Sequence, residues 1–153
     1  MSEGWAEYLA DGSLDSENLR AASDALADTA LSVEQSGVSP EAVAALDGAA
    51  WDDAAAADLA GDAEVATGYA ESLSEDAQAH LDRAVVERDF GDTADAAWEF
   101  QQAGLATDSA NSWSADAAAS YDAAAGYAES ADAGVLDASA DLAYDAGTDV
   151  AEY

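Results

Sequence analysis

The chain has no lysine, no cysteine and no isoleucine among its 153 residues, and it has one proline and one histidine. Without cysteine it can form no disulfide bond and can offer no thiolate to a substrate or a metal ion. A single histidine, His80, cannot build a zinc site of several histidines, and we expect this side chain to lie exposed on a helix. We therefore predict no metal site and no cofactor.

Positive charge is scarce, because three arginines are the only strongly basic side chains. Phosphate groups are bound by clustered lysine and arginine, so nucleic acid and anionic membrane surfaces are disfavoured as partners. No stretch approaches the roughly 18 apolar residues that a membrane-spanning helix needs. The first residues lack the basic region and apolar core of a signal peptide, so we expect the protein in the cytosol.

Acidic residues dominate the composition. They number 34 and give a net charge of -31, with 22 aspartates against 12 glutamates. Alanine supplies 44 residues, whereas leucine, valine and phenylalanine together supply 22. So few large apolar residues with so high a charge are typical of disordered chains. The helix-capping residues described below favour a folded chain instead, because a disordered chain has no use for them.

The same composition, with excess aspartate, no lysine and small core residues, resembles that of proteins from extreme halophiles, most often haloarchaea, and from their viruses. The resemblance implies a cytosol of molar salt, or a virus particle assembled in it. At 1 M salt the Debye length is about 3 Å, so exposed carboxylates hardly repel one another. We expect them to hold hydrated salt cations, while the salt strengthens apolar burial.

Capping and breaking residues divide the chain into helical segments. The clearest boundary is Ser39-Pro40-Glu41, with a capping hydroxyl, a proline at the first helical position and an acid in the first turn. Further boundaries are expected at Asp15, Gly37, Ser72 with Glu75, Phe90-Gly91-Asp92, Asn111-Ser112, Gly134 and Gly147. At Gly61-Asp62 the helix from Pro40 either ends or bends and continues to about Ser72. No segment alternates β-branched and aromatic residues as strands do. The sequence predicts an all-α protein, either an antiparallel helical bundle or a short helical-repeat solenoid of six or seven helices.

The length of the chain fits one helical domain over residues 1–153. Residues 1–12 carry Trp5, Tyr8 and Leu9 at helical spacing, so they form either a short helix or an arm that docks elsewhere. Residues 148–153 follow the last predicted helix as a short tail.

One helix pair has a familiar spacing. Gly91 and Asp92 in a turn, followed by Ala96, Phe100 and Ala103, resemble the turn and second helix of a tetratricopeptide repeat. The resemblance covers about one repeat, and it implies that Phe100 lies in the core. The alternative is that any two packed alanine-rich helices show this spacing.

The sequence contains one internal echo, because Gly-Tyr-Ala-Glu-Ser occurs at residues 68–72 and again at residues 126–130. A duplicated helical unit would explain it, and so would chance in a chain so rich in alanine. Both explanations stay open at this point.

Two tryptophans stand out as candidate partner-binding residues. Trp51 and Trp98 each lie about one residue away from the apolar stripe of their helix, a rotation of about 100°. We expect both indole rings to be exposed, and exposed tryptophan is enriched where proteins meet. The alternative is peripheral packing beneath a neighbouring helix.

No catalytic motif accompanies these features, so the sequence does not predict an enzyme. Our first hypothesis is a non-catalytic structural or assembly protein that acts through protein–protein contacts in high salt, such as a virion or adaptor subunit. The second is a repeat-type helical module that binds an intracellular peptide or protein on a concave face with Tyr121, Tyr127 and Trp98. The partner is then either another protein or the chain itself.

Overall fold

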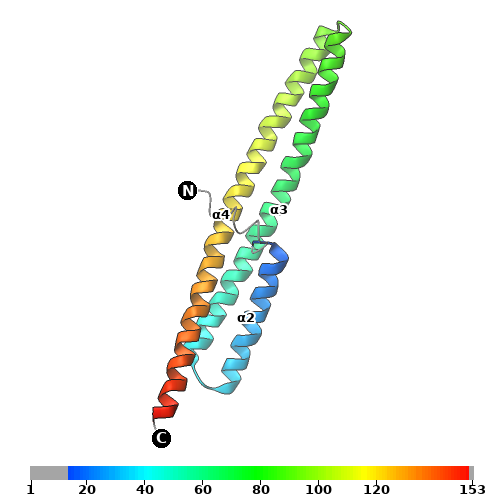
Figure 1. Cartoon of the computed structure of the whole chain (residues 1–153). Helices are drawn as coiled ribbons and strands as arrows, with labels where there is room; N and C mark the ends of the chain where they lie inside the picture. The colour runs from blue at the N-terminus through cyan, green and yellow to red at the C-terminus, as the bar shows by residue number, and fades with distance from the viewer. Residues whose placement is uncertain (1–13, 152–153) are drawn as a thin grey trace. The chain divides into compact units, whose positions relative to one another are not determined.

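The computed structural model describes residues 14–151, with side chains over residues 14–147. It contains three α-helices, α2 over Ser16–Ser36, α3 over Pro40–Asp89 and α4 over Thr93–Ala151 (Figure 1). No strand occurs in this part of the chain, so the predicted all-α class is confirmed. The predicted docking arm, residues 1–12, lies outside the described residues.

The prediction of six or seven helices is wrong. α3 is 50 residues long and α4 is 59 residues long, and neither is interrupted. The boundaries expected at Ser72, Asn111 and Gly134 lie inside these helices, and α4 continues past Gly147 into the predicted tail. At Gly61 the helix continues, which was one of the two alternatives. A glycine inside a helix costs only about 1 kcal/mol relative to alanine. Packing over many turns therefore outweighs each local signal for a helix end.

The ends of α2 and the start of α3 follow the predicted capping residues. The side chain of Asp15 accepts a hydrogen bond of 3.0 Å from the N–H of Glu17. Gly37 ends α2 with a φ of 69°, a left-handed conformation that glycine adopts without strain. The hydroxyl of Ser39 accepts a hydrogen bond of 3.2 Å from the N–H three residues further on. Each cap satisfies a polar group that the helix end leaves unpaired.

The turn between α3 and α4 also forms where it was predicted. Gly91 has a φ of 86°, and its N–H donates to the carbonyl of Arg88 at 3.0 Å. The N–H of Asp92 donates to the carbonyl of Glu87 at 2.9 Å, which completes a Schellman motif. The side chain of Asp92 then accepts from the N–H of Asp95 at 3.3 Å and caps α4.

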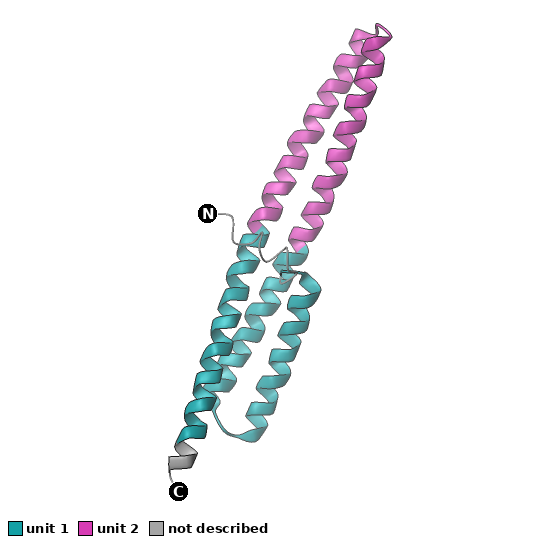
Figure 2. Cartoon of the chain, in the orientation of Figure 1, with its two compact units in different colours: residues 1–61, 120–153 teal, residues 62–119 magenta. Residues whose placement is uncertain are grey.

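The chain divides into two compact units (Figure 2). Unit 1 comprises residues 1–61 and 120–153, and three helical segments lie side by side in it. Unit 2 comprises residues 62–119 and is a hairpin of two antiparallel segments. An antiparallel arrangement was one of the two predicted architectures, whereas the organisation as one domain stays a prediction.

Alanine recurs at every seventh residue along both long helices, and every member of the series is buried. In α3 the series is Ala42, Ala49, Ala56, Ala63, Ala70, Ala77 and Ala84. In α4 it is Ala96, Ala103, Ala110, Ala117, Ala124, Ala131 and Ala138. A seven-residue repeat keeps one narrow face of a helix turned toward its neighbour. We call the position of these alanines a, and the six positions that follow it b to g.

Small side chains at this seam let two helix backbones approach closely. In unit 1, a Cβ atom added at Gly134 would lie 3.1 Å from the carbonyl oxygen of Ala45 and 3.1 Å from the Cβ of Ala49. Both neighbours belong to the rigid backbone region of a helix and cannot swing aside. The glycine that was predicted to break α4 therefore has a packing role within it.

In unit 1, α2 covers one side of the alanine seam. Its Ala30 joins Leu46 of α3 and Ala138 of α4 in one buried cluster. The hydroxyl of Ser23 in α2 donates to the carbonyl of Ala50 at 2.7 Å. α2 faces positions e and b of α3. The residues there are all buried, namely Leu46, Ala50, Asp53, Ala57 and Ala60. Ala30, together with the partly buried Leu26 and Val33, thus forms the face of α2 that packs.

In unit 2 the predicted stripes are partly wrong. Phe100 was expected in the core, but 42% of its surface is exposed, and Val65 and Tyr69 are exposed as well. The buried positions are instead the alanines of the seam, Ala96 and Ala103 among them. Large side chains stand beside the seam because two backbones this close leave room for little more than a methyl group between them.

Candidate functional site

Three ring pairs connect α3 to α4 beside the alanine seam. In unit 1, Trp51 meets Tyr127 edge-on with ring centroids 6.0 Å apart. In unit 2, Tyr69 lies 5.0 Å from Trp113, and His80 lies 6.0 Å from Trp98. Such pairs contribute roughly 0.5–1.5 kcal/mol beyond their burial. All six rings occupy positions c, d and g, on the side of the seam away from positions e and b.

The repeated pentapeptide Gly-Tyr-Ala-Glu-Ser makes the same type of ring contact in both of its copies. Each copy of Gly-Tyr-Ala-Glu-Ser places its tyrosine, Tyr69 or Tyr127, against a tryptophan of the facing helix. The two copies make the same kind of contact, one in each unit. Duplication itself stays a hypothesis.

Trp51 and Trp98 are exposed, as the sequence predicted, with 65% and 54% of their surfaces accessible. Each ring rests with one edge on its partner ring and leaves the other side open. Packing and exposure therefore occur together at these residues, and the partner-binding role of both stays a prediction.

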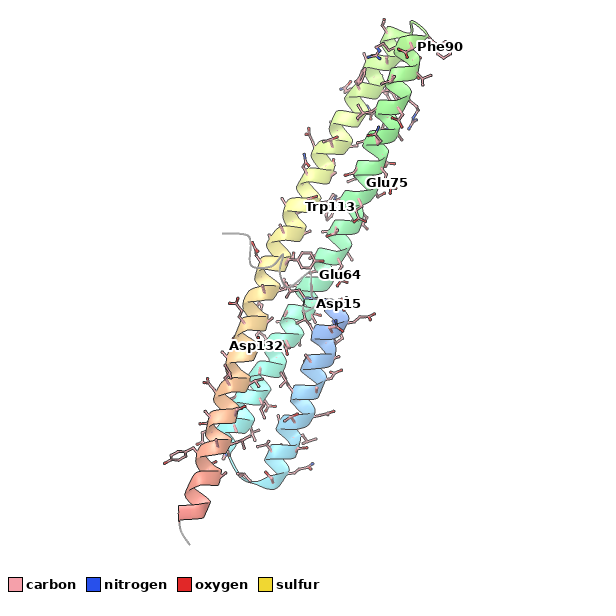
Figure 3. All side chains as sticks on the ribbon, in the orientation of Figure 1. Asp15, Glu64, Glu75, Phe90, Trp113 and Asp132 are labelled. Atoms are coloured by element: carbon pink, nitrogen blue, oxygen red, sulfur yellow. The ribbon has the colours of Figure 1, made fainter. Side chains whose placement is uncertain are left out.

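Uncovered apolar side chains are concentrated on unit 2. We define its aromatic flank as the exposed residues at positions c, d and g, namely Val65, Tyr69, Val86, Trp98, Leu105 and Trp113. Trp113 lies along the hairpin and Phe90 projects from the turn at its end (Figure 3). Large exposed apolar side chains gathered on one side of a unit make this flank a candidate contact surface.

A group of polar side chains lies beside the alanine seam near the turn of unit 2. The Nδ1 atom of His80 is hydrogen-bonded to Oε2 of Glu99, and the guanidinium of Arg83 lies 3.9 Å from Oε1 of the same carboxylate. The Glu99 side chain is only 8% exposed, and that of His80 is 21% exposed. The expectation that His80 lies exposed is wrong, because position d turns it toward Glu99. A buried carboxylate needs such partners.

Glu87 lies in the same part of unit 2, and its Oε2 atom is buried without a hydrogen-bond partner. Burial raises the pKa of Glu87 above its ordinary value of 4.5, and the nearby charge of Glu99 raises it further. Arg83 partly opposes this effect. The layer thus combines one histidine, one arginine and two glutamates.

Unit 1 has a polar group of a different kind. Asp53 is buried at position e, and burial together with the charges of Asp132 and Asp52 raises its pKa to about 6. Asp52 accepts a hydrogen bond of 2.6 Å from the hydroxyl of Ser130. Asp53 therefore faces like charges alone, whereas Glu99 of unit 2 has a histidine and an arginine beside it as well as the like charge of Glu87.

Glu99 contacts His80 and Arg83, and neither of these supplies a hydroxyl or thiol nucleophile. Within residues 14–147 no group of three histidine, aspartate or glutamate side chains could hold a metal ion. None of the described helices is long and apolar enough to cross a membrane.

The repeat-type binding module stays a hypothesis, but one of the three residues suggested for its concave face is not accessible. Tyr121 is buried, with 8% of its surface exposed, at a position e of unit 1. Trp98 belongs to unit 2 and Tyr127 to unit 1, each with a separate ring partner. The aromatic flank of unit 2 is the stronger candidate surface. The alanine at every seventh residue is the signal in the sequence that locates it.

No family model matches the chain, and no curated protein or solved structure is significantly similar to it.

Proposed function

We propose that this chain is a non-catalytic structural protein that assembles through protein–protein contacts in high salt, with the aromatic flank of unit 2 as a contact surface. The observation that carries the proposal is the exposure of Trp98 and its neighbours on unit 2, where residues 14–151 supply two packed helical segments and no third one. Molar salt makes exposed apolar surface costly and drives it together. The halophilic character proposed from the composition and the exposed flank therefore support the same role.

Trp98 is the residue on which the contact depends most. Tryptophan is enriched among the residues that contribute most to binding energy, and such residues tend to occupy the centre of an interface. The ring contact with His80 fixes the orientation of the indole before any partner arrives. A side chain that is already ordered loses less entropy on binding.

Sedimentation velocity in 3 M KCl tests the proposal. We expect the unaltered chain to form a defined assembly of several copies, and Trp98→Glu to lower its mass while far-ultraviolet circular dichroism stays helical. Gln101→Glu is the matched control, since Gln101 is exposed on the same helix but at position f, away from the flank. A mass that Trp98→Glu leaves unaltered would remove the aromatic flank from the contact, and a chain that stays at 15.4 kDa at all concentrations would contradict assembly.

A further inference from the structure

Unit 2 has a second flank on the other side of the seam, and this flank carries no charge. We define the uncharged flank as the exposed residues at positions e and b between Ser74 and Val85 in α3 and between Ala97 and Ser114 in α4. They are Ser74, Gln78, Leu81, Val85, Ala97, Phe100, Gly104, Thr107, Asn111 and Ser114. In a chain with 34 acidic residues, ten consecutive exposed members of one face include no carboxylate.

The apolar members of the uncharged flank gather toward the turn of the hairpin. Leu81 and Phe100 occupy position e of the two antiparallel helices, and Val85 follows one turn after Leu81. All three are more than a third exposed. Gly104 adds open space beside them, because a Cβ atom there would meet nothing within 4 Å.

Unit 1 shows what these positions do when they are covered. There the e and b positions of α3 carry Leu46, Ala50, Ala57 and Ala60, and α2 packs near them. Unit 2 presents the same positions of the same two helices, and none of the helices described by the structure packs on them there. By this comparison, the uncharged flank of unit 2 is a surface on which further helices can pack.

The distribution of charge indicates which of the two flanks can bind a second copy of the chain. Carboxylates at position g, such as Asp62, Asp76 and Asp95, lie among the residues of the aromatic flank, so two copies of that flank place acids near acids. Two copies of the uncharged flank bring no like charges together. The flank ends in Arg88 at one end and Glu71 at the other, at positions e and b of α3. An antiparallel pair of copies therefore places each Arg88 beside Glu71 of the second copy.

The size of the flank corresponds to a small protein–protein interface. Between the bordering residues Glu71 and Arg88, α3 is about 26 Å long at 1.5 Å per residue, and two helices side by side are about 20 Å wide. The covered surface is then about 500 Å² per copy, or about 1,000 Å² in total. That area lies at the lower end of protein–protein interfaces, below the standard range of about 1,200–2,000 Å².

We infer that the uncharged flank binds a second copy of this chain, with the two hairpins antiparallel about a two-fold axis, so that two two-helix units complete a four-helix bundle. Each α3 then lies along α3 of the other copy, and Phe100 approaches Phe100 of the other copy near the axis. This contact is separate from the one proposed at Trp98, and it can hold when that one fails.

The test uses the full chain carrying Trp98→Glu, so that contacts through the aromatic flank are removed. In 3 M KCl we expect this variant to sediment as a dimer of twice 15.4 kDa. Adding Phe100→Glu should give a monomer with unchanged helical circular dichroism, because it places two carboxylates together at the axis. Adding Leu105→Glu instead, on the aromatic flank, should leave the dimer intact.

A second measurement uses the charged residues that border the uncharged flank, Arg88 and Glu71. It does not depend on the apolar residues at the centre of the contact. At the lowest salt that preserves helicity, Arg88→Glu alone should raise the dimer dissociation constant at least tenfold, and Glu71→Arg alone should do the same. The double variant should restore it. A Trp98→Glu chain that is monomeric at every concentration, or a dimer that Leu105→Glu breaks and Phe100→Glu does not, overturns the inference.

Discussion

Unit 1 and unit 2 share the same two helices and the same alanine repeat, and they differ by one helix. In unit 1, α2 covers positions e and b, and Leu46 there is 4% exposed. In unit 2 no described part of the chain covers them, and Leu81 at the same repeat position is 38% exposed. Burial in this chain is thus decided less by residue type than by whether a third helix is present.

The difference extends to what each unit buries. Unit 1 buries Leu14, Leu19, Leu46 and Tyr121 beside its alanines. In unit 2 every buried residue is alanine except Glu99. Burial stabilises by about 25 cal/mol per Å² of apolar surface, so methyl groups contribute far less than leucine side chains. Unit 2 is therefore the weaker unit unless a partner covers it.

The largest expected effect follows from diluting the salt. Unit 2 holds 13 acidic residues and two arginines, and unit 1 holds 21 acidic residues and one arginine. The charge per residue is similar, but unit 2 has less buried apolar surface to oppose repulsion. As salt falls from 3 M to 0.1 M the Debye length grows from less than about 3 Å to about 10 Å. We expect helical circular dichroism to be lost over this range.

Hydrogen exchange locates the loss. At intermediate salt and low protein concentration, amides of unit 2 should lose protection before those of α2 and the neighbouring parts of unit 1. Helicity that stays constant down to 0.1 M salt would contradict the halophilic character. Simultaneous loss in both units would contradict the ranking of the two.

Sequence patterns predicted the ends of these helices better than their number. Asp15, Gly37, Ser39 and Gly91 act through local hydrogen bonds and backbone conformation, which a short stretch of sequence determines. Gly134 looked like another end, but its missing side chain serves close packing against α3. Local signals alone cannot separate these two roles of glycine, because the packing partner is distant in the sequence.

The candidate surfaces were predicted only in part. The exposure of Trp51 and Trp98 follows from their angular position on a helix, which the sequence shows. The exposure of Phe100 does not, because an aromatic residue near an alanine stripe is normally placed in a core. The contact of His80 with Glu99 depends on the pairing of two helices across the turn, which single-helix periodicity does not provide.

The second prediction compares Leu46 with Leu81. Leu46→Ala should lower the free energy of unfolding by about 2–5 kcal/mol, because it leaves a cavity beneath α2. Leu81→Ala should cost less than about 1 kcal/mol in the monomeric Trp98→Glu, Phe100→Glu background, since this side chain is partly exposed there. Urea titration in constant high salt measures both. Equal losses would mean that α2 does not distinguish the units.

The smallest expected effect concerns the two buried carboxylates. Asp53 of unit 1 faces Asp132 and Asp52, and its pKa is raised to about 6. Glu99 of unit 2 has His80 and Arg83 beside it. Asp53→Asn should therefore stabilise unit 1 at pH 7, whereas Glu99→Gln should destabilise unit 2 because it removes a paired charge.

The pH dependence gives the sign of the Asp53 effect. Between its ordinary pKa of 3.8 and about 6, the folded chain binds a proton at Asp53 that the unfolded chain has released. The contribution of Asp53 to stability is thus fully present below pH 3.8 and is lost as the pH rises through about 6. The advantage of Asp53→Asn over the unaltered chain should be greatest above pH 6, at no more than about 2 kcal/mol after solvent screening, and should vanish near pH 4. Thermal unfolding of both chains in 3 M KCl across this range measures the difference. An advantage that does not change with pH would mean that the asparagine stabilises by packing, and that Asp53 is not the carboxylate that takes up the proton.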